Sequence, residues 1–218
     1  MKERTPANLV RRYLMLLVGL FIMSLGVGFS IKAGLGTSPV SSVPYVLSDD
    51  ITPLTVGQTT ILFNCCLVLL QIVLLRRRFQ LVQLVQVPVA MAFGYLCDFS
   101  VWLLQSINPT TYWQQWIFCI AGILLVGTGV SFEVTADVVT MAGEGVALAL
   151  CKVFKLKFAS AKVCVDCSMV LIAVVLGFAF LHRLSGVREG TVAAAIFVGI
   201  TSRQVNKPMK HVGAKLLV

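Results

Sequence analysis

Long apolar runs, separated by short polar or glycine-rich stretches, dominate the pattern of hydrophobic and polar positions along the chain. Most of these runs reach the ~20 residues that an α-helix needs to cross the hydrocarbon core of a bilayer. The last run, which ends at Arg203, has the shortest uninterrupted apolar core. The pattern predicts an all-α membrane protein with six transmembrane helices, over residues 10–33, 57–75, 81–104, 113–134, 159–181 and 188–203.

Two further apolar stretches, 37–47 and 138–154, are broken by Gly, Pro, Ser or Glu and could be spans, interfacial helices or re-entrant segments. If neither of them spans, 15 of the 18 Lys and Arg residues fall on one side of the membrane. Because Lys and Arg concentrate in cytoplasmic loops, we prefer this arrangement, which places both termini in the cytoplasm. The 15 residues are Lys2, Arg4, Arg11, Arg12, Arg76, Arg77, Arg78, Lys152, Lys155, Lys157, Lys162, Arg203, Lys207, Lys210 and Lys215. The loop with Asp49 and Asp50 then lies outside, and so do Arg183 and Arg188, which do not fit the rule.

The composition agrees with a lipid environment, since 58% of the residues are hydrophobic and only 12% are charged, against about 25% charged in soluble domains. We therefore expect a single membrane domain over residues 1–218, without a separate soluble domain. The sequence has no phosphate-binding loop, nucleophile elbow or zinc pattern, so we expect no enzyme activity, no cofactor and no metal site. The net charge of +9 lies in short clusters between the spans, so we expect no nucleic-acid partner.

The two halves of the chain resemble each other at an offset of 103 residues. Eight positions between residues 19 and 48 have an identical counterpart: Gly19/Gly122, Gly26/Gly129, Val27/Val130, Phe29/Phe132, Ala33/Ala136, Thr37/Thr140, Val43/Val146 and Leu47/Leu150. The likeness continues beyond the first helix of each half, which argues against a chance match of apolar segments. We expect two repeats, 10–105 and 113–205, each with three helices and a broken re-entrant or interfacial segment. Two copies with an odd number of spans face opposite ways, as the inverted repeats of many secondary transporters do.

Three short motifs in the first third of the chain are distinctive. The first predicted helix ends in Ala33-Gly-Leu-Gly-Thr-Ser-Pro39, Thr55-Val-Gly-Gln58 opens the second, and Phe63-Asn64 follows within it. Together with the span pattern, these motifs resemble bacterial membrane proteins of the YczE/YitT type. The second half departs from the motif, because Val138-Val-Thr-Met-Ala142 replaces the glycine-rich core. The resemblance implies a multi-span protein of the bacterial inner (plasma) membrane and does not imply a substrate.

The broken segments supply the first candidate binding residues. Thr37 or Ser38 would cap a short helix that begins near Pro39, and the N–H groups of such a helix attract anionic groups. Glu144 lies in the equivalent segment of the second half. Two such helix ends that meet near the midplane would form a binding site. The alternative is an interfacial loop and helix among the lipid headgroups.

Polar residues within the predicted spans supply the other candidates. Asp98 and Asp166 lie in the third and fifth spans, and a charge at bilayer depth usually faces a partner or a cavity. Lys162 precedes Asp166 by four residues, so both lie on one helix face. With a small shift of the offset, from 103 to 102, Asn64 is the repeat counterpart of Asp166. A carboxylate at this level would bind a cation or carry a proton. Alternatively, Asp98 is solvated near the outer end of its span, and Asn64 joins two helices by a hydrogen bond.

These features favour a small secondary transporter or permease for a small molecule or ion, with a site near the midplane of the bilayer. A membrane substrate-binding or accessory subunit that works with a partner protein is the alternative. Beyond the lipid bilayer, a homo-oligomer or a membrane partner is left open.

Overall fold

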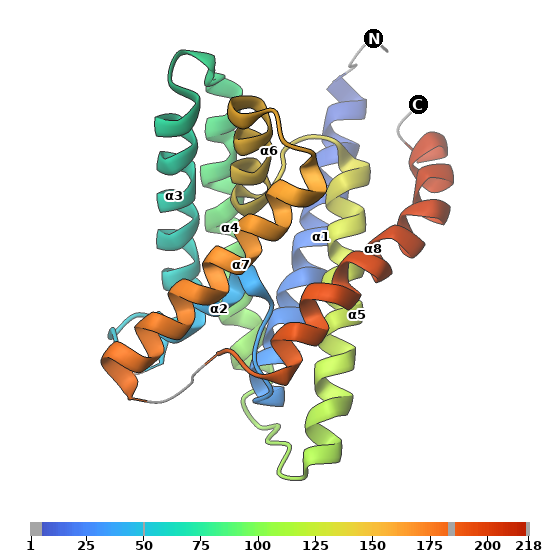
Figure 1. Ribbon diagram of the computed structural model, residues 1–218. Coiled ribbons are helices and arrows are strands. Elements are labelled where there is room, and N and C mark those ends of the chain that lie inside the picture. Colours follow the sequence, from blue (N-terminus) through green and yellow to red (C-terminus); the bar gives the residue numbers. More distant parts are fainter. Residues whose placement is uncertain (1–5, 50, 183–185, 217–218) are drawn as a thin grey trace.

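The computed structural model describes residues 6–49, 51–182 and 186–216, and this part of the chain is a bundle of helices without strands (Figure 1). Five of these helices are long and apolar enough to cross a membrane, in the regions Asn8–Ala33, Val56–Arg78, Leu81–Leu103, Tyr112–Ala136 and Phe158–Leu181. The structure therefore agrees with the membrane environment that the sequence predicts. The helices are α1 (Pro6–Ala33), α2 (Pro39–Ser48), α3 (Val56–Leu75), η1 (Arg76–Arg78), η2 (Leu81–Val85), α4 (Gln86–Leu103), α5 (Tyr112–Ala136), α6 (Ala142–Phe154), α7 (Phe158–Leu176), η3 (Gly177–Leu181) and α8 (Glu189–Leu216).

The sixth predicted span, 188–203, falls in α8, which is not among the five candidate spans. Its apolar run stops at Ser202-Arg203-Gln204, while the helix continues to Leu216. Helix α8 thus begins as a membrane helix would and ends as a polar one. Six transmembrane helices therefore stay a prediction.

The two broken stretches of the sequence form short helices, as expected. At 1.5 Å per residue, the 10 residues of α2 and the 13 residues of α6 extend about 15 Å and about 20 Å. Both are shorter than the ~30 Å hydrocarbon core, so neither helix crosses it alone. Helix α2 begins at Pro39, where the sequence predicts it, because proline suits the first turn of a helix.

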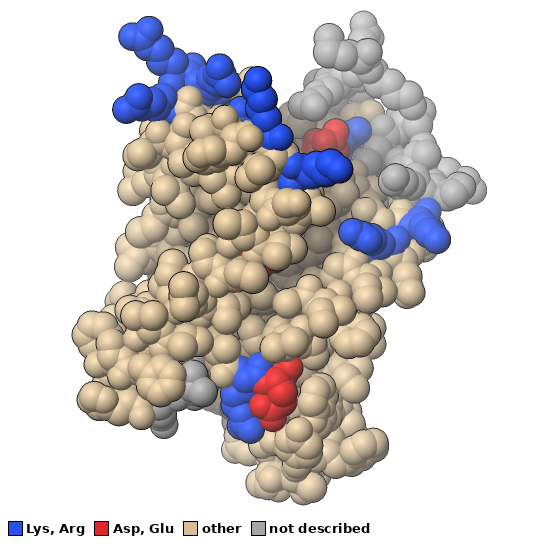
Figure 2. Space-filling view, viewed as in Figure 1, with Lys and Arg blue, Asp and Glu red and all other residues tan. Residues whose placement is uncertain are grey.

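The start of α1, the end of α8 and most of the described basic residues share one end of the bundle. Helix α1 begins and helix α8 ends at the upper end in Figure 1, and Lys and Arg side chains gather at the same end in Figure 2. The arginine cluster Arg76–Arg78 follows α3 there. Among the residues behind the predicted topology, Lys2, Arg4, Asp50 and Arg183 lie outside the described residues, as do the side chains of Lys210 and Lys215. One basic end agrees with the predicted orientation, and the cytoplasmic side stays a prediction.

Helices α1 and α5 cross at the centre of the bundle through glycines. Gly19 of α1 packs against Gly129 of α5, and Gly26 of α1 packs against Gly122 of α5. A Cβ atom on Gly26 would lie 2.7 Å from the backbone nitrogen of Val126, which no real Cβ tolerates. The two backbones touch at this crossing, as they do at small-residue interfaces between membrane helices.

The two short helices each pack against a long helix of the other half of the chain. The short helix α2 packs against α7, and the short helix α6 packs against α3. Helix α7 is the least covered of the candidate spans, with 22% of its apolar stretch buried against 50% for α1.

Candidate functional site: a polar cavity beside α6

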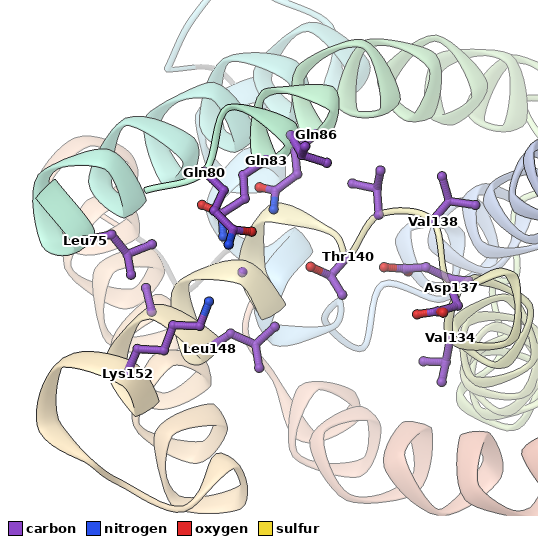
Figure 3. Close-up of a pocket in the computed structure, with 15 residues that line it drawn as sticks. Leu75, Gln80, Gln83, Gln86, Val134, Asp137, Val138, Thr140, Leu148 and Lys152 are labelled. Atoms are coloured by element: carbon purple, nitrogen blue, oxygen red, sulfur yellow. The ribbon is translucent and has the colours of Figure 1, made fainter. Parts of the chain in front are cut away.

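A cavity of about 330 Å³ lies between the C-terminal ends of α3 and α5, the helix η2, and one face of α6. In Figure 3, the glutamines of the segment after α3 and Lys152 lie on one side of the cavity, and Asp137 and Val138 on the other. Its volume suits a small solute. The lining residues are Leu75, Gln80, Val82, Gln83, Gln86, Glu133, Val134, Asp137, Val138, Val139, Thr140, Gly145, Leu148, Ala149 and Lys152.

Glu133 is the most buried charged residue of the cavity wall. Its exposed fraction is 3%. One carboxylate oxygen accepts a hydrogen bond of 2.7 Å from the N–H of Met141, because the left-handed turn at Asp137 brings the start of α6 back to the end of α5. No Lys or Arg of the described chain lies within ion-pair distance of Glu133. A buried carboxylate without a cation is costly, so its neighbourhood favours a positive ligand or a proton.

Asp137, at the edge of the cavity, is much less constrained. Its side chain is 79% exposed, and its carboxylate lies 3.9 Å from Nη1 of Arg12. The same Arg12 nitrogen donates a shorter hydrogen bond, 2.8 Å, to the carbonyl of Ala136. An exposed pair at this distance contributes little to stability. Asp137 therefore adds negative charge to the mouth of the cavity.

Amide side chains form the wall opposite Asp137. Gln71 is fully buried behind the wall, and its Nε2 donates to Gln86 Oε1 at 3.0 Å and to the carbonyl of Ala142 at 3.1 Å. Gly145 packs directly against the Gln71 side chain. A Cβ atom at position 145 would lie 2.5 Å from Gln71 Oε1, so only glycine leaves enough room there. The Oε1 atoms of Gln71 and Gln83 are buried and accept no hydrogen bond from the described residues. Of these two residues only Gln83 lines the cavity, so the wall holds one acceptor oxygen whose bonding capacity is unused.

Three of the candidates from the sequence come together on α6 and α7. Lys162 Nζ contacts Asp166 Oδ1 at 2.9 Å, which agrees with the predicted shared face. Burial raises the pKa of the Glu144 carboxyl in α6, the positive charge of Lys162 lowers it, and Asp166 raises it. These residues form a charged network next to the cavity, although Glu144, Lys162 and Asp166 do not line it.

Asn64 lies in the interior of the bundle. It is 2% exposed, its Nδ2 donates to the carbonyl of Thr60 at 2.8 Å, and its Oδ1 is buried without a partner in the described chain. Asn64 and Gln71, two turns apart on α3, are both buried. Asn64 does not line the cavity.

The other candidates hold the backbone in place. Asp98 accepts hydrogen bonds of 2.7 Å from the N–H of Gly57 and from the hydroxyl of Thr55, so it caps the start of α3 from α4. Thr37 is buried, and its N–H donates to the carbonyl of Gly186 at 3.0 Å. Ser38 precedes α2 without a side-chain capping bond, and its hydroxyl donates to Ser41.

Several cavity residues that are not among the candidates from the sequence lie near the ends of the candidate spans. Glu133 and Asp137 lie near the end of the fourth predicted span, where they resemble solvated residues, and Gln83 and Gln86 lie at the start of the third. Only the fold of α6 against α3 turns these positions toward a shared cavity. The signal available in the sequence was Glu133 itself, a carboxylate inside an apolar run.

Comparison with known proteins places the chain among relatives without an assigned activity. It is 27% identical over 165 residues to a protein of Haemophilus influenzae described as uncharacterized, a match that covers 74% of this chain and 71% of the relative. No solved structure matches the chain. Residues 10–207 match the family described as "Family of unknown function (DUF6198)", and the chain belongs to this family.

Proposed function

We propose that the protein is a small secondary transporter or permease of the bacterial inner membrane, which moves a small solute through the cavity beside α6. The observation that carries this proposal is Glu133, a carboxylate that is 3% exposed, lines the cavity and has no cation within ion-pair distance in the described chain. Such a group is expensive to keep in a membrane bundle and is usually retained for a ligand or an ion pathway. The proposal includes no catalytic role.

The arrangement of the two halves supports an inverted repeat over 10–105 and 113–205. Gly19 and Gly122 are repeat counterparts, as are Gly26 and Gly129. The structure pairs Gly19 with Gly129 and Gly26 with Gly122, which is the exchange that a two-fold axis through the α1–α5 crossing requires. The packing of α2 on α7 and of α6 on α3 is exchanged in the same way. Two related halves around a central crossing can move against each other, as in many transporters.

The two ends of the bundle differ in a way that fits alternating access. At the end opposite the termini, the loop after α1 is joined to the start of α8. The N–H of Gly190 donates to Leu35 O at 2.8 Å, the N–H of Thr37 donates to Gly186 O at 3.0 Å, and Arg188 Nη1 donates to Gly34 O at 3.1 Å. We call this set of contacts, between residues 34–37 and 186–190, the latch.

The repeat counterparts of the latch line the cavity. At the offset of 103, Leu35 corresponds to Val138 and Thr37 to Thr140, and both Val138 and Thr140 are cavity residues. Gly186 corresponds to Gln83 at the same offset, and Gln83 lies on the opposite wall. Residues 34–37 and 186–190 are therefore in contact at one end of the molecule. Their repeat counterparts at the other end, Val138 and Thr140 on one side and Gln83 on the other, are separated by the cavity. In a transporter that alternates between two states, the structure would represent one of them. In the other state the contacts of the latch would be broken and the cavity would be closed.

Cysteine labelling tests this exchange. In oriented vesicles, a membrane-impermeant thiol reagent should label Thr140→Cys from the side of the termini, and Thr110→Cys, a control in an exposed loop, from the opposite side. A cross-link between Gln83→Cys and Thr140→Cys should close the cavity and speed the labelling of Thr37→Cys from the side of residue 110. If residue 37 stays unlabelled in both states, the protein does not alternate. The cavity would then favour the second candidate, a substrate-binding or accessory subunit that depends on a partner.

A further inference from the structure

The cavity has a polarity that points to a class of solute. Its buried charge is the carboxylate of Glu133, and only one carboxylate oxygen is engaged, by the N–H of Met141. Gln83 contributes an Oε1 atom that is buried and accepts no hydrogen bond from the described chain. The interior of the cavity therefore offers acceptors and negative charge.

We propose that the cavity binds its solute through a primary ammonium group, with Glu133 as the counter-ion and Gln83 Oε1 as a second acceptor. An ammonium group has three N–H donors and no acceptor, which complements these oxygens. Hydrogen bonds between an ammonium group and a carboxylate are among the stronger ones in proteins. The inference rests on the proposed function, because it names the solute that the cavity carries.

Other ligand classes fit the cavity less well. An anion would approach the buried carboxylate of Glu133 against its repulsion, because the cation of the lining, Lys152, lies on the wall opposite Asp137 and is exposed. A tightly held metal ion needs several ligands together, and the described chain has no group of three His, Cys, Asp or Glu residues that could hold one. The volume of about 330 Å³ also exceeds what a bare ion fills and suits a small organic molecule.

Lys152 distinguishes two sources of an ammonium group. This exposed residue lies on the wall opposite Asp137 (Figure 3). A free amino acid could place its carboxylate near Lys152 while its ammonium group reaches Glu133. A simple amine has no carboxylate that could interact with Lys152. The shared chemistry is the ammonium group, and substitution of Lys152 separates the two cases.

Thermal unfolding of the full chain in detergent, with sets of small probes, tests the proposal. The probes are glycine and larger amino acids, aliphatic amines and diamines, and the carboxylates of matching size. Ammonium-bearing probes should raise the Tm of the wild type, and the carboxylates should not. Glu133→Gln keeps the size of the side chain and an oxygen for the Met141 N–H, so it should fold, and it should bind the amines about tenfold more weakly or worse. Asp49→Asn, at the end of α2 and outside both the cavity and the latch, is the matched control and should bind as the wild type does.

Each outcome decides the question. If Lys152→Gln weakens the amino acids alone, the solute is a zwitterion. If it changes nothing, the solute is an amine. Stabilisation that survives in Glu133→Gln, stabilisation by carboxylates alone, or no response to any ammonium probe would overturn the inference. Labelling of residue 37 in the cross-linked protein, described above, reports separately on transport and does not depend on the nature of the solute.

Discussion

The glycine crossing of α1 and α5 makes a quantitative prediction about stability. In Gly26→Ala, the new methyl group would lie 2.7 Å from the backbone nitrogen of Val126 and 2.8 Å from the carbonyl oxygen of Gly122. Backbone atoms cannot rotate away as a side chain can, so the two helices must separate. Overpacking of this kind costs about 1–3 kcal/mol. The higher helix propensity of alanine offsets up to about 1 kcal/mol of that cost.

A matched variant removes the contribution of helix propensity. Gly199 lies within α8, and a Cβ there would meet nothing within 4 Å. Gly199→Ala therefore gains the propensity of alanine without a clash. We expect Gly26→Ala to be less stable than Gly199→Ala by about 1–3 kcal/mol. At about 2–4 °C per kcal/mol for a chain of this size, its Tm should be lower by about 2–12 °C.

The buried thiols provide the assay. Cys97 and Cys119 are each 1% exposed, so they react with a fluorogenic thiol reagent only when the bundle opens, above the baseline set by the exposed cysteines. Heating the protein in detergent with this reagent gives the Tm of each variant. Gly129→Ala, the repeat counterpart, should lose as much stability as Gly26→Ala. Equal Tm values for Gly26→Ala and Gly199→Ala would show that the two helix backbones do not touch at this point.

Three further predictions concern stability. Asp98→Ala should lower the free energy of unfolding by about 1–3 kcal/mol, because the Gly57 N–H and the Thr55 hydroxyl lose their acceptor. Asp137→Asn, at an exposed carboxylate, should change the free energy of unfolding by less than ~0.5 kcal/mol. Similar losses in the two variants would contradict the capping role of Asp98. Lys162→Met should destabilise the protein by leaving Asp166 without its cation, and Lys162→Met/Asp166→Leu should recover part of the loss in a double-mutant cycle; additive losses would argue against the pair. Gly145→Ala should lower the Tm, because its Cβ would lie 2.5 Å from Gln71 Oε1, and Gly143→Ala, with its nearest neighbour at 3.4 Å, should not; equal values would mean that Gln71 can move at little cost.

Much of the helical architecture could be predicted from the sequence because apolar length and proline position act locally. The five candidate spans and the start of α2 at Pro39 follow from these local signals. The end of α8 does not, because it depends on how far a helix continues after its apolar run, and Arg203 and Lys207 do not stop a helix. A polar continuation is compatible with either side of a membrane boundary.

The site was harder to predict because a buried polar residue can have a local or a distant partner. Asp98 and Thr37 attracted attention as polar residues in apolar surroundings, and both are engaged with backbone groups. The partners are 41 and 149 residues away in the chain, so no local pattern reveals them. Glu133 has the same appearance in the sequence, and only the packing of α6 shows that it lines a cavity. Lys162 and Asp166 were predictable, because a spacing of four residues fixes their contact within one helix.

The sparse covering of α7 makes the lipid a structural partner of this helix. Helix α7 and η3 together form an apolar segment of 24 residues, of whose most apolar stretch only 22% is buried within the bundle. At 1.5 Å per residue the segment is about 36 Å long. A segment longer than the local hydrocarbon core settles by tilting, and the short helices α2 and α6 are the main protein contacts of α7. The helix carries Lys162 and Asp166, whose charges reach Glu144 beside the cavity. We therefore expect the length of the lipid acyl chains to affect this protein. Thinner membranes should tilt α7 further and so move the charges of Lys162 and Asp166 relative to Glu144.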